Sequence, residues 1–187
     1  MHFQRVSEQL QNVDTDLVNS FASFIKTKIF LEGKSLFVCG NGGSFSIASH
    51  FTTDLSKIGI DLGNKCKIVC LGSNNSLSTA ISNDYTYSWI FSKELSNLGN
   101  SGDVLFAISS SGLSSNILTC VETANALGIN TMSLVGFKDS KLAVSSNLTI
   151  DLMLKPGDYE LAEDVHSSIC HSVSLLIKGS LLPDPKK

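Results

Sequence analysis

Five short apolar runs alternate with segments of helical periodicity along this chain, and this alternation is what most constrains its fold. The runs are continuous rather than polar at every second position, which is typical of strands that are covered on both faces. The predicted strands cover residues 35–39, 67–71, 104–108, 130–135 and 147–152. Strands that alternate with helices favour a parallel sheet, so the sequence predicts an α/β fold with helices on both faces of a five-stranded sheet.

Helical segments are expected between these strands and at both ends of the chain. Apolar residues at helical spacing from residue 5 to residue 30 predict one long helix before the first strand. A second long helix is expected over residues 160–182, because Pro183 and Pro185 would end it. Shorter helices are expected over residues 44–57, 74–81, 87–98, 114–127 and 139–144. No linker or low-complexity tract interrupts the sequence, so residues 1–187 are expected to form a single domain.

Charge and cysteine usage narrow the class of protein. The chain has 187 residues, a net charge of −3 and no basic run, which argues against a nucleic-acid-binding surface. Its five cysteines lie in apolar segments and show no C-x-x-C spacing. This pattern indicates buried, reduced thiols in a reducing compartment. Neither a signal peptide nor an apolar run of about 20 residues is evident. We therefore expect a soluble, cytoplasmic protein that does not bind a membrane.

The first predicted strand breaks directly into the small-residue turn Gly40-Asn41-Gly42-Gly43-Ser44, and a helix begins there. Glycines allow the backbone to approach an anion closely, and the first turn of a helix offers free N–H donors at the positive end of its dipole. The turn lacks the G-x-G-x-x-G pattern and the P-loop lysine, which disfavours dinucleotide and ATP sites. Residues 40–44, called the glycine loop below, are predicted to bind a phosphate group.

A second small-residue turn, residues 109–115, follows the third predicted strand and is called the serine loop below. Ligands of open parallel sheets bind beyond the carboxyl ends of the strands, where both loops are expected. Serine hydroxyls and backbone N–H groups at a helix start can bind a phosphate without lysine or arginine. Alone, this turn could equally be a capping cluster, but together with the glycine loop it favours binding. The predicted phosphate binders are Ser109, Ser110, Ser111 and Ser114.

His50 and Asp54 are four residues apart in the predicted helix after the glycine loop, so they share one helix face. An imidazole and a carboxylate can act as acid and base near neutral pH, and both are zinc ligands. Asp54 cannot be a metal ligand and a free base at the same time. Such a pair is also common as an ordinary helix contact, so the pair alone leaves all of these interpretations open.

The order and spacing of these motifs resemble the sugar isomerase (SIS) domain family, and within it the phosphoheptose isomerases. The resemblance covers nearly the whole chain and implies a flavodoxin-like three-layer αβα sandwich. It also implies a homotetramer with active sites at subunit interfaces, in which residues 1–33 pack on the core or on a neighbouring subunit. The implied substrate is a phosphorylated sugar. The resemblance rests on C-G-N-G-G-S at 39–44, His50 with Asp54, Asn83-Asp84, G-D-V-L-x-x-I-S-x-S-G at 102–112, and Glu163 with His171.

The resemblance further implies a reaction and roles for single residues. The reaction would convert sedoheptulose 7-phosphate to D-glycero-D-manno-heptose 7-phosphate through an enediol. Asp54 and His171 fall on the positions of the catalytic base and its partner. The implied ligands of one zinc ion per subunit are His50, Asp54, Glu163 and His171. The implied substrate and phosphate binders are Asn41, Gly42, Gly43, Ser44, Asp84, Ser109, Ser110, Ser111, Ser114 and Glu163.

Three residues depart from the pattern of the family. Asp54 stands where glutamate is usual, and Glu163 stands where glutamine is typical. Ile58, beside Lys57, replaces an arginine that is common there. The added charge of Glu163 predicts tighter metal binding. Two alternatives stay open: a non-catalytic SIS protein that binds a phosphosugar or a protein partner such as the replication initiator, and an isomerase of another phosphosugar.

Helix geometry limits how the implied zinc ligands can meet. Glu163 and His171 are eight residues apart, which is about 12 Å along a helix axis. Both can reach one ion only from opposite directions or from different subunits. His166 lies about 140° round the helix from His171, so we expect these two histidines to face different surroundings.

Overall fold

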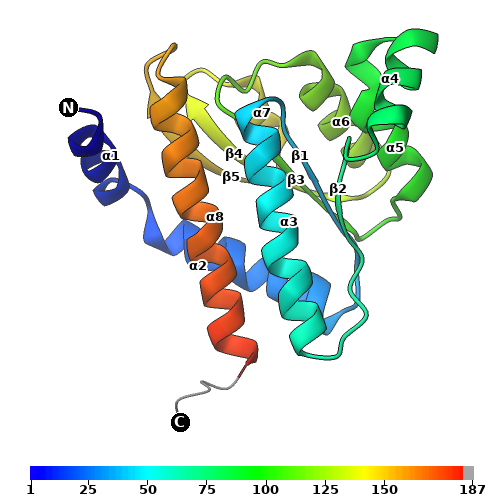
Figure 1. Ribbon diagram of the computed structural model, residues 1–187, viewed down its shortest axis with the longest axis horizontal. Coiled ribbons are helices and arrows are strands. Elements are labelled where there is room, and N and C mark those ends of the chain that lie inside the picture. The colour runs from blue at the N-terminus through cyan, green and yellow to red at the C-terminus, as the bar shows by residue number, and fades with distance from the viewer. Residues whose placement is uncertain (183–187) are drawn as a thin grey trace.

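The computed structural model describes residues 1–182 and places a parallel sheet between two layers of helices (Figure 1). Its strands pair in the order β2-β1-β3-β4-β5, and every pair is parallel. This is the strand order of flavodoxin-like folds. The predicted fold class and the five predicted strands are therefore confirmed. The strands are β1 (Leu36–Cys39), β2 (Ile68–Cys70), β3 (Val104–Ser109), β4 (Asn130–Phe137) and β5 (Leu148–Leu154).

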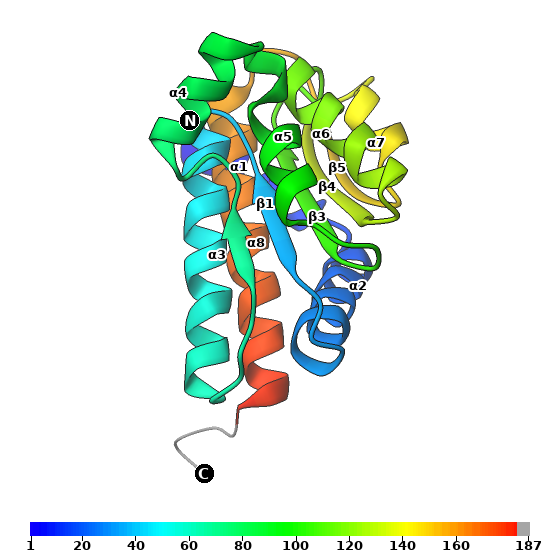
Figure 2. The same cartoon turned by 90° about the vertical axis from the view of Figure 1, so that its right-hand side faces the viewer.

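Successive strand residues point to opposite faces of the sheet and fill two separate hydrophobic cores. Leu36 and Val38 belong to one core, which α2 (Thr15–Ile25), α3 (Gly43–Asp61) and α8 (Tyr159–Leu181) cover. Phe37 and Cys39 belong to the other, which helices from the middle of the chain cover. These helices are α4 (Asn75–Asp84), α5 (Ile90–Leu98), α6 (Ser115–Ala126) and α7 (Lys141–Ser145), with a short 3-10 turn, η2 (Tyr87–Trp89). Figure 2 shows the two layers edge on.

The N-terminal segment is divided into three helical pieces, so the prediction of one helix over residues 5–30 is wrong. The pieces are α1 (His2–Gln11), α2 and a π-helix, η1 (Lys26–Leu31). The helix is interrupted before α2 at Asp14. The side chain of Asp14 caps α2 by accepting hydrogen bonds from the N–H groups of Asp16 and Leu17. Helix α1 has no buried residue and contacts the rest of the chain through polar pairs such as Arg5–Asp158, at 2.7 Å.

The remaining boundaries differ from the prediction mainly in α3, which continues past Lys57 to Asp61. Gly59 therefore lies inside the helix, with the side chain of Cys66 packed closely against it. The helix ends just before Gly63, whose positive φ of 69° an L-residue would rarely adopt. Pro183 and Pro185, predicted to end the last helix, lie outside the described residues. Among residues 1–182, no helix is long and apolar enough to cross a membrane.

Candidate active site

Helices α3 and α8 lie side by side on one face of the sheet, and their facing surfaces carry the candidate catalytic residues (Figure 1). Helix α3 follows β1, and α8 follows β5, so both begin at the carboxyl edge of the parallel sheet. This edge is where ligands of such sheets bind. The two helices therefore run side by side away from the predicted phosphate loops. The side chains on their facing surfaces line one shared groove.

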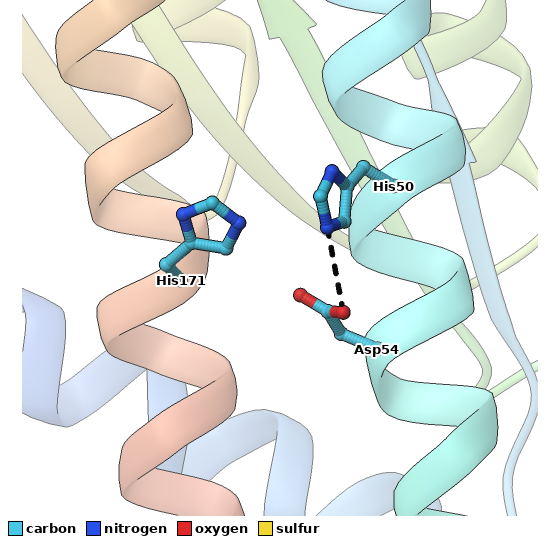
Figure 3. Close-up of side chains that lie close together, drawn as sticks. All are labelled: His50, Asp54 and His171. Carbon is cyan, nitrogen blue, oxygen red and sulfur yellow. Dashed lines mark ion pairs between the residues drawn. The ribbon is translucent and has the colours of Figure 1, made fainter.

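His50 and Asp54 on α3 meet His171 on α8 (Figure 3). One ligand atom of each side chain lies within 4.8 Å of the other two. The Nε2 atom of His50 is 3.6 Å from Oδ1 of Asp54, and the two imidazole rings are 5.0 Å apart with nearly perpendicular planes. A separation of 3.6 Å is too long for a strong hydrogen bond, which needs about 2.7–3.2 Å. The three side chains thus form a loose cluster that is open to a ligand.

The donor set and spacing of this cluster fit a zinc ion. Zinc binds imidazole nitrogen and carboxylate oxygen at about 2.0–2.2 Å in a tetrahedron, so neighbouring donors lie about 3.4 Å apart. The 3.6 Å separation between His50 and Asp54 is already close to that spacing. The ligand atom of His171 lies within 4.8 Å of both. Three protein ligands would leave a fourth position for a further protein ligand, for substrate or for water.

Grooves beside the cluster give a small molecule access to it. One, of about 190 Å³, extends from Ser46 past His50 and Asp54 to His171. A second, of about 220 Å³, shares Asp54 and His171 and ends between Lys57 and Lys178. Ile58, which replaces the arginine common in the family, has a nearly buried side chain that also lines this second groove. The flexible cations at this end of the groove are therefore Lys57 and Lys178.

Cys170, next to His171, is buried beneath the cluster. Burial, and to a smaller extent the charge of Asp54, raises the pKa of its thiol. The neutral form is favoured, so Cys170 is neither a ready nucleophile nor a ready thiolate ligand in this state. The imidazoles and the carboxylate are the groups that remain for chemistry.

Close backbone packing shapes the glycine loop. A Cβ atom on Gly40 would lie 2.6 Å from the carbonyl carbon and oxygen of Ser44, so only glycine fits there without moving the backbone. Gly42 precedes α3 with φ 54° and ψ −123°. Within the described chain, α3 has no side-chain N-cap, and the N–H groups of Phe45 and Ser46 already bond to the Gly42 carbonyl. The first N–H groups of the helix are thus the ones left for an anion.

Asn41, a predicted substrate binder, uses its side chain to join the two loops. Its amide exchanges two hydrogen bonds of 2.9 Å with the amide of Asn116, in the first turn of α6 after the serine loop. The hydroxyl of Tyr87 also donates to Asn41, at 3.1 Å. Neither Asn116 nor Tyr87 was predicted as a site residue, because neither belongs to a local motif. The pairing fixes the spacing between the glycine loop and the serine loop.

The serine loop holds its shape partly with its own hydroxyls. The hydroxyl oxygen of Ser109 accepts a hydrogen bond from the N–H of Gly112, and that of Ser111 accepts one from Leu113. Ser114 is the N-cap residue of α6 but makes no side-chain cap bond. The hydroxyl of Ser110 is buried and, within the described residues, has no partner. An unsatisfied buried hydroxyl is rare and is consistent with a ligand that completes its bonding.

Glu163 and Asp84 lie apart from the His50–Asp54–His171 cluster. The carboxylate of Glu163 packs directly against Gly43, in the first turn of α3, where a Cβ atom would overlap it. Gly43 precedes His50 by seven residues, which is about 10 Å along the helix. Asp84 is exposed at the end of α4 and accepts a hydrogen bond of 3.0 Å from Asn83. The predicted role of Glu163 as a zinc ligand therefore stays a prediction.

His166 faces away from the cluster, as the helix angle predicted. It is fully buried, and within the described chain neither ring nitrogen has a partner with good hydrogen-bond geometry. Burial lowers the pKa of this imidazole to about 4, although the nearby backbone of Val135 partly opposes the shift. His166 is therefore neutral at physiological pH and belongs to the core between α8 and β4.

Comparisons with known proteins agree with this geometry. The SIS domain family model matches residues 2–136. A phosphoheptose isomerase of Cytophaga hutchinsonii is 36% identical over 162 residues, 86% of this chain and 83% of that protein. One of Helicobacter pylori is 34% identical over 170 residues, 91% of this chain and 86% of that protein. The structure of a phosphoheptose isomerase from Neisseria gonorrhoeae matches with a TM-score of 0.82 at 28% identity, covering 94% of this chain and 95% of that one.

The strand order, the two polar loops at the carboxyl edge and the cluster between α3 and α8 define an α/β protein with a ligand site at that edge. The matches make the assignment specific, because they extend over most of the chain and most of each relative. The chain belongs to the SIS domain family. Its relatives named above are phosphoheptose isomerases.

Proposed function

We propose that this chain is a phosphoheptose isomerase, which converts sedoheptulose 7-phosphate to D-glycero-D-manno-heptose 7-phosphate in heptose biosynthesis. The observation that carries the proposal is the convergence of His50, Asp54 and His171 between α3 and α8. Two loops suited to a phosphate group begin at the same edge of the sheet. The relatives at 34–36% identity that bear this name support the choice of reaction.

The reaction needs a proton to move between two carbon atoms and another between two oxygen atoms. A base removes a proton from C1 of the ketose, which gives an enediol, and the same group returns the proton to C2. Asp54 is suited to this step because its carboxylate faces the groove. His171 lies across the groove, where an imidazole can pass the proton of the O1 hydroxyl to O2. The aldose forms with no net change in atoms or electrons.

We propose zinc as the metal of this site, one ion per subunit, held by His50, Asp54 and His171 with Glu163 as the predicted further ligand. When bound, zinc would polarise the sugar oxygens and stabilise negative charge on the enediol. The mixed imidazole and carboxylate donors support this choice. Because a liganded Asp54 is a weaker base, the metal and base roles of Asp54 compete.

The proposed assembly is a homotetramer in the cytoplasm with active sites at subunit interfaces. Exposed apolar side chains near the groove support an interface there, among them Ile60 on α3 and Leu175 on α8, at 76% and 66% exposure. A partner subunit over this face would exclude water from the cluster. Exclusion of water strengthens the electrostatic interactions on which enediol chemistry depends.

A coupled assay with sedoheptulose 7-phosphate tests the reaction. Asp54→Asn and His171→Ala should each lower kcat/KM by at least about 100-fold, the usual contribution of a general acid or base. Glu122→Gln is the control, because it removes an exposed carboxylate from α6, on the opposite face of the sheet from the cluster. Tight substrate binding without turnover in the wild type, unaffected by either substitution, would instead indicate a non-catalytic phosphosugar-binding protein.

A further inference from the structure

The 3-10 turn η2 lies between α4 and α5 in the chain and packs against α6. Its residues Tyr87 and Ser88 are adjacent, but they bond to different loops. The hydroxyl of Tyr87 donates a hydrogen bond of 3.1 Å to Oδ1 of Asn41 in the glycine loop. The hydroxyl of Ser88 lies 3.0 Å from that of Ser115, the last residue of the serine loop. One short turn thus connects both loops.

The Tyr87 hydroxyl belongs to a continuous hydrogen-bond network. Oδ1 of Asn41 also accepts a hydrogen bond of 2.9 Å from Nδ2 of Asn116, so both of its lone pairs are used. Asn116 is buried, and its own Oδ1 accepts a further hydrogen bond of 3.0 Å from the N–H of Ile117. Hydrogen bonds in such a chain strengthen one another. The network therefore runs from η2 through the glycine loop to the backbone of α6.

The turn that carries Tyr87 is itself held in a defined conformation. Nζ of Lys93 lies 4.5 Å from the ring centroid of Tyr85 and 5.0 Å from that of Trp89, within the range of cation–π contacts. The two rings also lie close together, with centroids 5.9 Å apart. The N–H of Trp89 donates a hydrogen bond of 3.0 Å to the carbonyl of Thr86. These contacts fix the backbone on both sides of Tyr87, so the turn can hold two loops in place.

The exposure of Tyr87 separates a role in the site from a role in stability. Tyr87 is 57% exposed, so water can replace its lost hydrogen bond at little cost to the folded state. Tyr85, at 59% exposure, is a similar surface tyrosine whose hydroxyl is not part of the network. Removal of the Tyr87 hydroxyl should therefore loosen the connection between the loops without unfolding the protein.

We propose that Tyr87 is a positioning residue that acts through Asn41 and, together with Ser88, sets the distance between the glycine loop and the serine loop. The inference rests on the proposed function and deepens it. Groups from both loops must converge on one substrate, so a change in their separation weakens substrate binding. The chemical step is affected less, because the network includes neither Asp54 nor His171.

Steady-state kinetics of the full chain with sedoheptulose 7-phosphate tests this role. Tyr87→Phe keeps the ring and removes only the hydroxyl. It should raise KM about three- to tenfold, the effect of one hydrogen bond on binding, while kcat stays within about twofold of the wild type. Tyr85→Phe is the matched control and should change neither constant. Urea denaturation of both variants should give the midpoint of the wild type.

A double-mutant cycle shows whether Tyr87 acts through Asn41. In the Asn41→Ala background, Tyr87→Phe should cause no further rise in KM, because the acceptor of its hydrogen bond is already missing. Additive effects would mean that the hydroxyl contacts the substrate directly, and they would overturn the positioning role. Ser88→Thr, which keeps the hydroxyl, should have a KM closer to that of the wild type than Ser88→Ala.

The outcomes separate this inference from the proposed function. If the wild type converts the substrate and Tyr87→Phe has the same KM, the positioning role is wrong and the proposed function stands. A Tyr87→Phe variant that loses kcat and stability together would show a purely structural role and would also contradict the inference. If the wild type neither binds nor converts the substrate, the proposed function is overturned and the inference fails with it.

Discussion

Gly40→Ala is the sharpest test of the glycine loop, because the added methyl group would meet backbone rather than side chain. The Cβ atom would lie 2.6 Å from the carbonyl carbon and oxygen of Ser44 and 3.0 Å from the nitrogen of Phe45. These atoms belong to the first turn of α3, which the hydrogen bond from Phe45 N–H to the Gly42 carbonyl holds in place, at 3.0 Å. Relief of the collision therefore requires movement of the loop or of the helix.

The expected cost follows from two opposing terms. Insertion of a methyl group into a tightly packed site costs about 1–3 kcal/mol. Gly40 does not have a positive φ, so alanine also lowers the entropy of the unfolded chain and recovers about 0.4–1 kcal/mol. The net loss in the free energy of unfolding should be about 1–2 kcal/mol. For a chain of this size the melting temperature should fall by roughly 3–6 °C.

Gly43→Ala is the matched control three residues away. The atoms nearest to its Cβ atom would be those of the Glu163 carboxylate, the end of a flexible side chain that can rotate aside. The cost should be limited to the lost contact with the helix dipole, about 0.3–1 kcal/mol. Urea denaturation of both variants at one pH and salt concentration measures the difference. If Gly40→Ala is as stable as the wild type, or if Gly43→Ala is the more damaging, the backbone geometry of this loop is not as described.

Three further predictions concern the core, the connection between the loops and the metal. Burial lowers the pKa of His166 to about 4 from its usual 6.5, so the unfolded chain binds this proton first as the pH falls. The free energy of unfolding should therefore drop by up to about 3 kcal/mol between pH 6.5 and pH 4. Urea denaturation of His166→Leu across this pH range should not show that drop. Asn41→Ala leaves the buried Asn116 amide without its partner and should cost about 1–3 kcal/mol in thermal or urea unfolding. Asp54→Glu should retain zinc more strongly than the wild type against a chelator, whereas Asp54→Asn should retain less.

The layered fold could be predicted because its signals are local. Continuous apolar runs mark strands buried on both faces, and each of the five runs became a strand. The order of the strands came from the resemblance, since periodicity contains no information on which strands are neighbours. The break before α2 could not be found by apolar spacing, because Leu10 and Leu17 continue the same helical period across it. The capping oxygen of Asp14 decided that boundary.

The site could be predicted only as far as helix geometry extends. The i, i+4 spacing placed His50 beside Asp54. The eight-residue separation predicts that Glu163 and His171 reach one ion only from opposite directions or from different subunits. The contact of Glu163 with Gly43 joins residues 120 positions apart, and no local pattern indicates it. The pair of Asn41 and Asn116 is likewise set by the packing of α6 against the loops. Such contacts arise from tertiary structure alone.

The length of Asp54 connects the departure from the family pattern to the geometry of the cluster. Donor atoms in the cluster lie within 4.8 Å of one another, whereas a zinc tetrahedron brings neighbouring donors to about 3.4 Å. Nε2 of His50 and Oδ1 of Asp54 are already 3.6 Å apart, so any wider separation involves His171 on the other helix. A glutamate at position 54 is longer by one carbon–carbon bond, about 1.5 Å, and would extend further toward α8. We therefore expect the shorter aspartate to bind a metal less tightly and to leave its carboxylate freer to act as a base.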